Sequence, residues 1–214
     1  MKPEIAPEQD QPKSFAFSKA NEKKIKQIIA RYPVGKQKSA IMPLLDLAQR
    51  QMAETNKDVG GWIPTAAMNE IARMLEVSDM KVYEVATFYT MYNLAPVGKY
   101  NIQCCTTTPC WLRGSSDVVK AAEKKLGIKM GQTTKDQKFT LTEVECMGAC
   151  VNAPMIQIND DYYEDLTPEV MENLIEGMKK DKLPKKGPQN GRVNSMNIQG
   201  PTSLEQEAKK AKVI

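Results

Sequence analysis

The chain has 214 residues, enough for one large domain or two small ones. Its hydrophobic content of 41% and charged content of 26% are those of an ordinary globular protein. The net charge of +4 is mild and dispersed, and only 6% of the residues are aromatic, so nothing indicates a nucleic-acid surface. No stretch approaches the roughly 20 apolar residues that cross a bilayer, so we expect any membrane association to come through partners.

The cysteines and the N-terminus bear on the cellular compartment. Five cysteines, an odd number without the spacing of a secreted disulfide framework, favour a reducing compartment. The segment MKPEIAPEQD is acidic and contains prolines, which fits neither a secretory signal nor an Arg-rich transit peptide. We therefore expect that a targeting segment either never existed or has been removed.

The first half of the chain is expected to be helical. Residues 1–17 carry prolines and charges without an apolar period, which predicts an extended arm. Residues 18–95 repeat apolar residues with the 3.6-residue period of helices, which predicts a helical bundle. The expected helices are one that ends at Pro33, one over 41–52 with Pro43 in its first turn, one from about Pro64, and one from an N-cap at Ser78 to about Asn93.

The fourth expected helix has an apolar face that includes aromatic side chains. A stripe of this kind at helical spacing is more often core than a cofactor site, so we assign it to the interior of the bundle. Its members are Val82, Val85, Phe88, Tyr89 and Tyr92.

Residues 96–183 predict an α/β domain. After Pro96-Val97-Gly98 the apolar period changes from 3.6 to 2. The order strand, helix, strand, strand, strand, helix predicts a mixed sheet with flanking helices, of thioredoxin-like size. The expected elements are a strand over 99–105, a helix after Cys110 that ends at Gly127, a strand over 139–145, a hairpin around Asn159-Asp160, and a helix begun by Thr167-Pro168.

Residues 184–214 are rich in proline and glycine, and their apolar residues have no period. Such a tail cannot build its own core, so it is either disordered or an extended strap laid over a partner, and we favour the strap.

Four cysteines carry most of the chemical information. Cys105 and Cys110 have the spacing C-x4-C in CTTTPC, and Cys146 and Cys150 have the spacing C-x3-C in CMGAC. The chain has no histidine, so any metal at these cysteines is held by thiolates. Structural zinc tolerates such spacings, a disulfide-exchange site would prefer C-x-x-C, and the wide C-x4-C loop favours a 2Fe-2S cluster.

The loops around these cysteines suit a cluster whose sulfurs carry negative charge. Thr106, Thr107 and Thr108 offer N–H and hydroxyl donors, and Cys110 is expected at a helix N-terminus, where the dipole favours a thiolate. The small residues Gly148 and Ala149 let the backbone approach closely.

The charges beside the second cysteine pair predict the potential of the cluster. Glu143 and Glu145 add negative charge near Cys146, which resists the addition of an electron. We therefore expect a low-potential centre.

Cys104 is expected to take no part. Strand alternation places Tyr100, Ile102 and Cys104 on one face and Cys105 on the other. Because Ile102 marks the core side, Cys104 is interpreted as a small buried hydrophobe.

No complete active site is expected in this chain alone. Without histidine there is no Ser/His/Asp set, and no GxGxxG or P-loop pattern occurs. The acidic residues at 160, 161, 164 and 165 are assigned to a solvated turn.

The segments CTTTPCWLRGS, LTEVECMGACVNAPMIQIND and DYYEDLTPE resemble the 24 kDa 2Fe-2S subunits of respiratory NADH:ubiquinone oxidoreductase, complex I. The FYTMYN segment of the helical region is also similar to that family, and the resemblance covers about residues 18–187. It implies a helical bundle followed by a thioredoxin-like domain. It also implies that one 2Fe-2S cluster is bound by Cys105, Cys110, Cys146 and Cys150.

The resemblance also implies partners and a location. The expected partners are the flavoprotein subunit, which holds FMN and oxidises NADH, and a neighbouring iron-sulfur subunit. The cluster would exchange electrons with the flavin. The expected location is the peripheral arm on the matrix side of the mitochondrial inner membrane, or on the cytoplasmic side in a bacterium.

Two alternatives to this function stay open at the level of sequence. One is the equivalent diaphorase subunit of a soluble NAD-linked hydrogenase or formate dehydrogenase. The other, from a different class, is a zinc-stabilised interaction module without a redox role.

Overall fold

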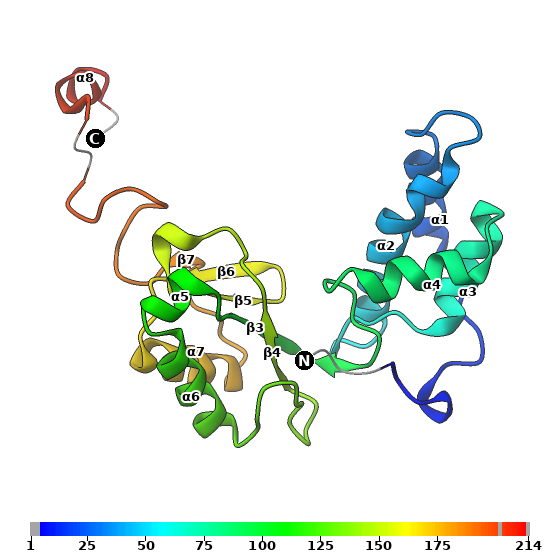
Figure 1. Cartoon of the computed structure of the whole chain (residues 1–214), viewed down its shortest axis with the longest axis horizontal. Coiled ribbons are helices and arrows are strands. Elements are labelled where there is room, and N and C mark those ends of the chain that lie inside the picture. The colour runs from blue at the N-terminus through cyan, green and yellow to red at the C-terminus, as the bar shows by residue number, and fades with distance from the viewer. Residues whose placement is uncertain (1–4, 201–202, 213–214) are drawn as a thin grey trace. The chain divides into compact units, whose positions relative to one another are not determined.

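The structure is a computed structural model that describes residues 5–200 and 203–212 (Figure 1). It divides into two compact units, one of Met1–Asn101 with Met130–Thr142 and the other of Ile102–Lys129 with Glu143–Ile214. The chain passes between the units at three points: two lie within the strands Tyr100–Cys105 and Phe139–Val144, and the third lies in the loop after Leu126. The expected α/β class with a helical N-terminal part is confirmed, while the domain boundaries at residues 17, 95 and 183 stay predictions.

Four helices form the core of the first unit. They are α1 (Lys19–Ile29), α2 (Ile41–Thr55), α3 (Thr65–Leu75) and α4 (Asp79–Phe88). The Ser18 hydroxyl caps α1 by accepting from the Asn21 N–H, and Pro43 lies in the first turn of α2, where no backbone donor is lost. Their buried faces meet in one apolar cluster, which includes Ile25, Leu44, Leu45, Ala48, Ala67, Met68, Ile71 and Val82.

The aromatic stripe assigned to the fourth helix is only partly core. Helix α4 ends at Phe88 and not near Asn93, because the backbone of Tyr89 is extended (φ −85°, ψ 115°). Beyond that point the helical period no longer sets side-chain direction. Phe88 is 77% exposed and Tyr89 is 38% exposed, so their assignment to the core is wrong. Val82 and Tyr92 are buried as expected, and the Tyr92 hydroxyl donates to the Met42 carbonyl at 2.9 Å.

The described part of the N-terminal arm lies on the helical unit. The Ala6 N–H donates to the Leu94 carbonyl at 3.0 Å, and Gln11 accepts from the Thr65 N–H through its side chain. Phe17 is buried in the helical core. Residues 1–4 of the expected arm lie outside the described residues.

The first unit also contains a two-stranded antiparallel sheet of β1 (Val59–Gly60) and β2 (Val97–Gly98). At Gly98 a Cβ atom would come within 2.7 Å of the Phe139 backbone, so only glycine fits there.

A five-stranded mixed sheet carries the remaining strands in the order β4-β3-β5-β6-β7. Cross-strand pairs place Ile102 opposite Ile158, and Cys104 and Tyr163 on either side of Ile156, so these buried residues share one face. The pairings are antiparallel for β3–β5 and β5–β6 and parallel for β6–β7. The strands are β3 (Tyr100–Cys105), β4 (Phe139–Val144), β5 (Ile156–Ile158), β6 (Asp161–Glu164) and β7 (Gly187–Pro188).

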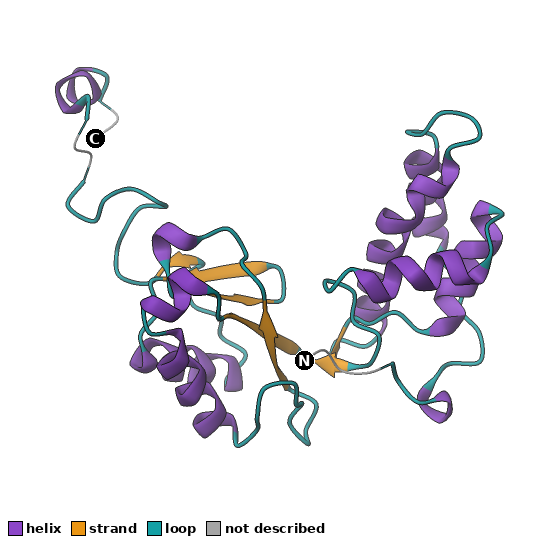
Figure 2. Cartoon of the chain, in the orientation of Figure 1, coloured by secondary structure: helices purple, strands orange, loops and turns teal. Residues whose placement is uncertain are grey.

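Helices α6 (Ser115–Leu126) and α7 (Pro168–Lys179) pack beside each other against the sheet (Figure 2). The Thr167 hydroxyl caps α7, and α6 ends at Gly127 in the left-handed conformation (φ +68°), both as predicted. The short helix α5 (Thr108–Leu112) precedes α6.

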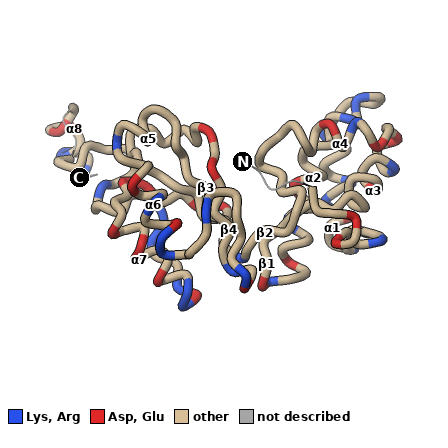
Figure 3. Tube along the Cα trace, turned by 60° about the horizontal axis from the view of Figure 1, so that its bottom comes forward, with Lys and Arg blue, Asp and Glu red and all other residues tan. Residues whose placement is uncertain are grey.

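The tail does not behave as one extended segment. Strand β7 adds residues 187–188 to the sheet, and the Gln189 N–H donates to the Glu164 carbonyl at 3.0 Å. The exposed helix α8 (Glu205–Lys210) follows, and residues 201–202 and 213–214 lie outside the described part. Basic and acidic residues are interspersed over the helices (Figure 3). No helix in residues 5–200 and 203–212 has the length and apolar character to cross a membrane.

Candidate metal centre

The four predicted cysteines lie at the ends of neighbouring elements in the second unit. Cys105 ends β3, Cys110 lies in the first turn of α5 as predicted, Cys146 follows β4, and Cys150 begins the 3-10 turn Cys150–Asn152. They form two thiol pairs. The Cys146 and Cys150 sulfurs are 3.3 Å apart, and Cys105 and Cys110 share a hydrogen bond. Cys146 and Cys150 are exposed, whereas Cys105 and Cys110 are buried. The centre therefore has an outer side, formed by the exposed pair, and an inner side, formed by the buried pair.

The Thr107 side chain lies between the two pairs. Its hydroxyl is 3.3 Å from the Cys105 sulfur and also hydrogen-bonds to Cys146. Thr107 is the N-cap residue of α5, yet its side chain makes no capping bond, because its hydroxyl faces the sulfurs. Within the described residues, no three or more His, Cys, Asp or Glu side chains gather as a site for one metal ion.

Backbone N–H groups from three loops point at the sulfurs. Thr107 and Met147 donate to Cys105, Met155 donates to Cys110, and Gly148 donates to Cys146. Gly148 has a φ of +85°, a left-handed conformation that favours glycine. Glycine is therefore favoured here by its backbone conformation. A Cβ atom at Gly148 would meet no described atom within 4 Å, so the small size that the sequence suggested stays a prediction. Several N–H dipoles aimed at sulfur form a site suited to negative charge.

In each pair, the pKa of one thiol is lowered and that of the other is raised. Burial raises the pKa of Cys105, but hydrogen bonds from Thr107 and Cys110 outweigh it and hold that pKa below the ordinary thiol value. Burial, with the hydrogen bond to Cys105, raises the pKa of Cys110 to about 12. The Gly148 N–H lowers the pKa of Cys146, and the bond to Cys146 raises that of Cys150. A metal that binds these sulfurs must displace the protons that remain on the thiols.

A small apolar floor supports the buried pair. Cys105 and Cys110 pack against Ala153 and Met155, with Tyr162 at the margin. The Tyr162 hydroxyl donates to the Met147 carbonyl at 2.9 Å, which fixes the loop between β4 and Cys150.

Cys104 lies apart from this arrangement, as strand alternation predicted. It is 1% exposed and pairs with Ile156 on the apolar face of the sheet. Burial raises the pKa of its thiol to about 12, so it stays neutral.

Residues 25–179 match the thioredoxin-like [2Fe-2S] ferredoxin family. The chain belongs to this family. The family carries a 2Fe-2S cluster, and the two thiol pairs with their inward N–H donors fit such a cluster, because each of its irons takes two thiolate ligands.

Close relatives of this ferredoxin are named as subunits of one kind of complex. A subunit of the NADH-quinone oxidoreductase of Rickettsia bellii is 59% identical over 168 residues, which cover 78% of this chain and 96% of the relative. The mitochondrial NADH dehydrogenase [ubiquinone] flavoprotein 2 of Dictyostelium discoideum is 50% identical over 190 residues, which cover 89% of this chain and 74% of the relative.

A solved structure shares the fold at low sequence identity. The NAD+-reducing [NiFe]-hydrogenase in the H2-reduced state aligns with a TM-score of 0.54 and 19% identity, over 66% of this chain and 23% of the hydrogenase chain. This likeness shows the fold alone.

Two groups around the ferredoxin centre differ from the sequence-based interpretation. The Thr106 hydroxyl donates to the Glu143 carboxylate at 2.7 Å, not to a sulfur. The acidic run is only partly a solvated turn. Asp160 is exposed in the turn as expected. Asp165, in contrast, is an almost fully buried partner of Arg192, and Asp161 pairs with Lys186 at 2.6 Å. The clustering of acidic residues in the sequence had suggested a solvated loop. Basic partners from residues 186–192 instead neutralise Asp161 and Asp165.

Several supporting residues were missed by the sequence-based interpretation. Met147, Met155 and Tyr162 contribute backbone donors or loop contacts that no residue-type pattern reveals. Asn152 and Arg192 hold the turn that carries Cys150, and they lie 40 positions apart in the chain. The only hint in the sequence was the position of Asn152, two residues after a ligand candidate.

Proposed function

We propose that this chain is the electron-transfer subunit of an NADH:quinone oxidoreductase, complex I, and that Cys105, Cys110, Cys146 and Cys150 bind its 2Fe-2S cluster. The observation that carries the ligand assignment is the convergence of two thiol pairs around Thr107, with N–H donors aimed at their sulfurs. The relatives in Rickettsia bellii and Dictyostelium discoideum support the complex.

The chemistry that the bound cluster supplies is one-electron transfer. The residues of the chain provide its ligands and its environment. Cys105 and Cys110 hold the inner side in an apolar, water-poor surrounding, and N–H and hydroxyl dipoles favour added negative charge. Glu143 and Glu145, both exposed, oppose it, which supports the predicted low potential.

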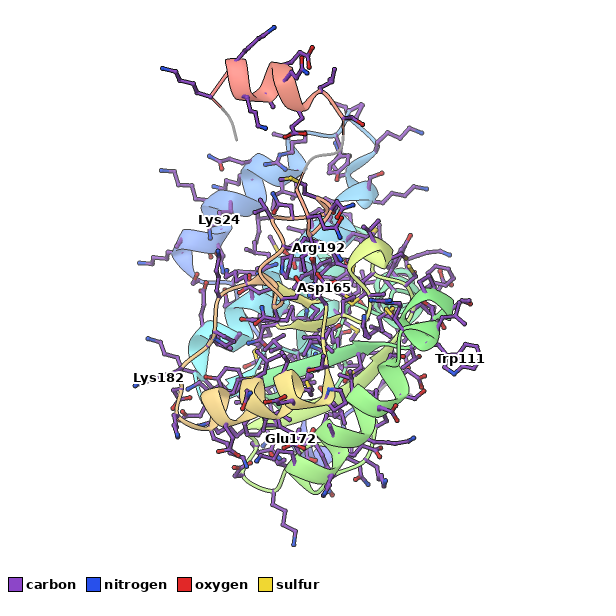
Figure 4. The ribbon with its side chains drawn as sticks, turned by 90° about the vertical axis from the view of Figure 1, so that its left-hand side faces the viewer. Lys24, Trp111, Asp165, Glu172, Lys182 and Arg192 are labelled. Atoms are coloured by element: carbon purple, nitrogen blue, oxygen red, sulfur yellow. The ribbon has the colours of Figure 1, made fainter. Side chains whose placement is uncertain are left out.

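Exposed apolar residues next to the cysteines in the chain support a docking surface for an electron partner. Large apolar side chains follow two of the ligands directly: Trp111 and Leu112 after Cys110, and Val151 after Cys150. They are 61%, 70% and 68% exposed. Figure 4 shows Trp111 projecting from the surface. Exposed aromatic and aliphatic residues that directly follow candidate ligands in the chain fit a protein interface. We assign it to the flavoprotein subunit that holds FMN and oxidises NADH, with a neighbouring iron-sulfur subunit as a further partner.

This assignment implies a location. The chain belongs to the peripheral arm, on the matrix side of the mitochondrial inner membrane or on the cytoplasmic side of a bacterial membrane. Association with the membrane then comes through the other subunits of the complex.

The ligand assignment is tested by the iron and acid-labile sulfide content of the purified chain and by its EPR spectrum after reduction with dithionite. We expect about two irons and two sulfides per chain. Cys146→Ser should remove most of the visible absorption, while Cys104→Ser, one residue from a ligand, should retain it. Zinc without a reducible signal, or full absorption in Cys146→Ser, would show the assignment to be wrong.

The complex is tested by co-purification of the tagged chain from its source cells. Recovery with a quinone-reducing membrane complex supports the proposal. Recovery with a soluble diaphorase activity would show that the chain serves a hydrogenase or formate dehydrogenase instead.

A further inference from the structure

We propose that Arg192 is a positioning residue for the cluster, because its guanidinium fastens the turn that carries Cys150. This role rests on the proposed ligand role of Cys150. It gives the segment after α7 a task within its own domain.

The sheet brings this segment to the site. Parallel pairing of β7 with β6 places Gly187 beside Tyr163 and Pro188 beside Glu164. The Gln189 N–H continues the pairing to the Glu164 carbonyl at 3.0 Å. The pairing therefore fixes the direction in which residues 189–194 leave, past the end of β6.

The Arg192 side chain contacts three groups there. One terminal nitrogen lies 3.2 Å from the Asp165 carboxylate (Figure 4). The other donates to the Asn152 side-chain oxygen at 3.3 Å and approaches the Val151 carbonyl at 3.4 Å. The Arg192 side chain is 16% exposed and that of Asp165 is 5% exposed. Two terminal nitrogens held in one planar fork reach three groups here, a use of arginine that the single ammonium of lysine does not reproduce.

The turn after Cys150 depends on these contacts. Val151 and Asn152 are the two residues after Cys150, and they complete its 3-10 turn. Asn152 is 2% exposed, and it donates to the Asn194 carbonyl at 2.9 Å while its own carbonyl accepts from the Asp165 N–H at 2.7 Å. Cys150 itself is exposed. A three-residue 3-10 turn is weak by itself, so its geometry depends on these partners.

The charge of Arg192 is balanced, which separates positioning from an electrostatic effect. Asp165 neutralises Arg192 at 3.2 Å, so the pair as a whole adds little field at the cluster. Asp165 also has a φ of +54°, a conformation that is uncommon for a non-glycine residue and persists where the surroundings impose it. Through its contacts with Val151 and Asn152, Arg192 is thus expected to fix the position of the Cys150 sulfur.

The test uses the full chain loaded with its cluster. Two quantities are measured: the rate at which a chelator bleaches the visible absorption, and the EPR line shape of the reduced cluster. For Arg192→Gln we expect bleaching faster by on the order of tenfold, with a broadened EPR signal. Arg192→Lys keeps the charge but not the fork, and should fall between Arg192→Gln and wild type.

Lys186→Gln is the matched control. It breaks the 2.6 Å pair with Asp161 in the same segment but does not contact the turn, so it should stay within about twofold of wild type. Wild-type bleaching and EPR line shape in both Arg192 variants would overturn the inference. If Arg192→Gln does not fold, Arg192→Lys decides in the same way. A wild-type chain without iron would instead overturn the proposed function.

Discussion

The Thr107 hydroxyl is predicted to raise the reduction potential of the cluster, and Thr107→Val measures that effect. The substitution replaces a hydroxyl by a methyl group of similar size. The substitution removes no capping hydrogen bond from α5, because the Thr107 side chain makes none. The change is therefore confined to the 3.3 Å contact with the Cys105 sulfur and the bond to Cys146.

The magnitude follows from one hydrogen bond. A hydroxyl donates only one proton, so it serves one sulfur at a time. The net stabilisation from one such hydrogen bond is about 1 kcal/mol. Reduction adds negative charge to the sulfurs and strengthens the bond, so its loss disfavours the reduced state. Since 1.4 kcal/mol corresponds to about 59 mV for one electron, the midpoint should fall by roughly 40 mV.

The assay is a redox titration of the cluster-loaded chain, followed by the EPR signal of the reduced form. Thr107→Ser keeps the hydroxyl and should remain within about 10 mV of wild type. Thr106→Val removes a hydroxyl that bonds to Glu143 and not to a sulfur, so it should not reproduce the drop. A Thr107→Val midpoint equal to that of wild type, or an equal shift in Thr107→Ser, would refute the reasoning.

Two further predictions concern the helical unit. Ile71 is fully buried on α3, so Ile71→Ala should lower the free energy of unfolding by about 2 to 5 kcal/mol in denaturant titrations. As a control, Ala in place of the exposed Asn69 should change it by less than about 1 kcal/mol. A loss of less than about 1 kcal/mol in Ile71→Ala would contradict the core assignment. Burial raises the pKa of Tyr92 to about 12 from about 10 in the unfolded chain, so its contribution is complete below pH 10 and is lost as the pH rises toward 12. Between pH 9 and 11, wild type should therefore lose about 1 kcal/mol more stability than Tyr92→Phe, and equal losses would show that the hydroxyl does not titrate in this way.

Local rules predicted the candidate ligand set and much of the fold. Strand alternation separated Cys104 from Cys105, because the period of two holds within a single strand. The cap at Thr167 and the glycine at 127 marked helix ends, because each satisfies backbone groups next to it in the chain.

Other features were not predictable from residue type and local spacing. Helix α4 ends at Phe88 although the apolar spacing continues to Tyr92, and no residue type at that point announces the end. Strand β7 has only two residues, one of them proline, and it exists because β6 offers a partner. The burial of Asp165 depends on its ion pair with Arg192, which lies 27 positions later in the chain. Without knowledge of this partner, the charge of Asp165 suggested that its side chain is exposed to solvent.

The form of β7 also bears on self-association of the chain. Open sheet edges invite pairing with a second copy, and short strands or proline discourage it. Strand β7 forms one edge of the sheet with two residues, and Pro188 has no N–H to offer. At the other edge, β4 is covered by backbone hydrogen bonds from its own hairpin, between Gly131 and Leu141 and between Thr134 and Phe139. Among the described strands, neither edge of this sheet is therefore long and unpaired. Such short or covered edges resist aggregation of the free chain.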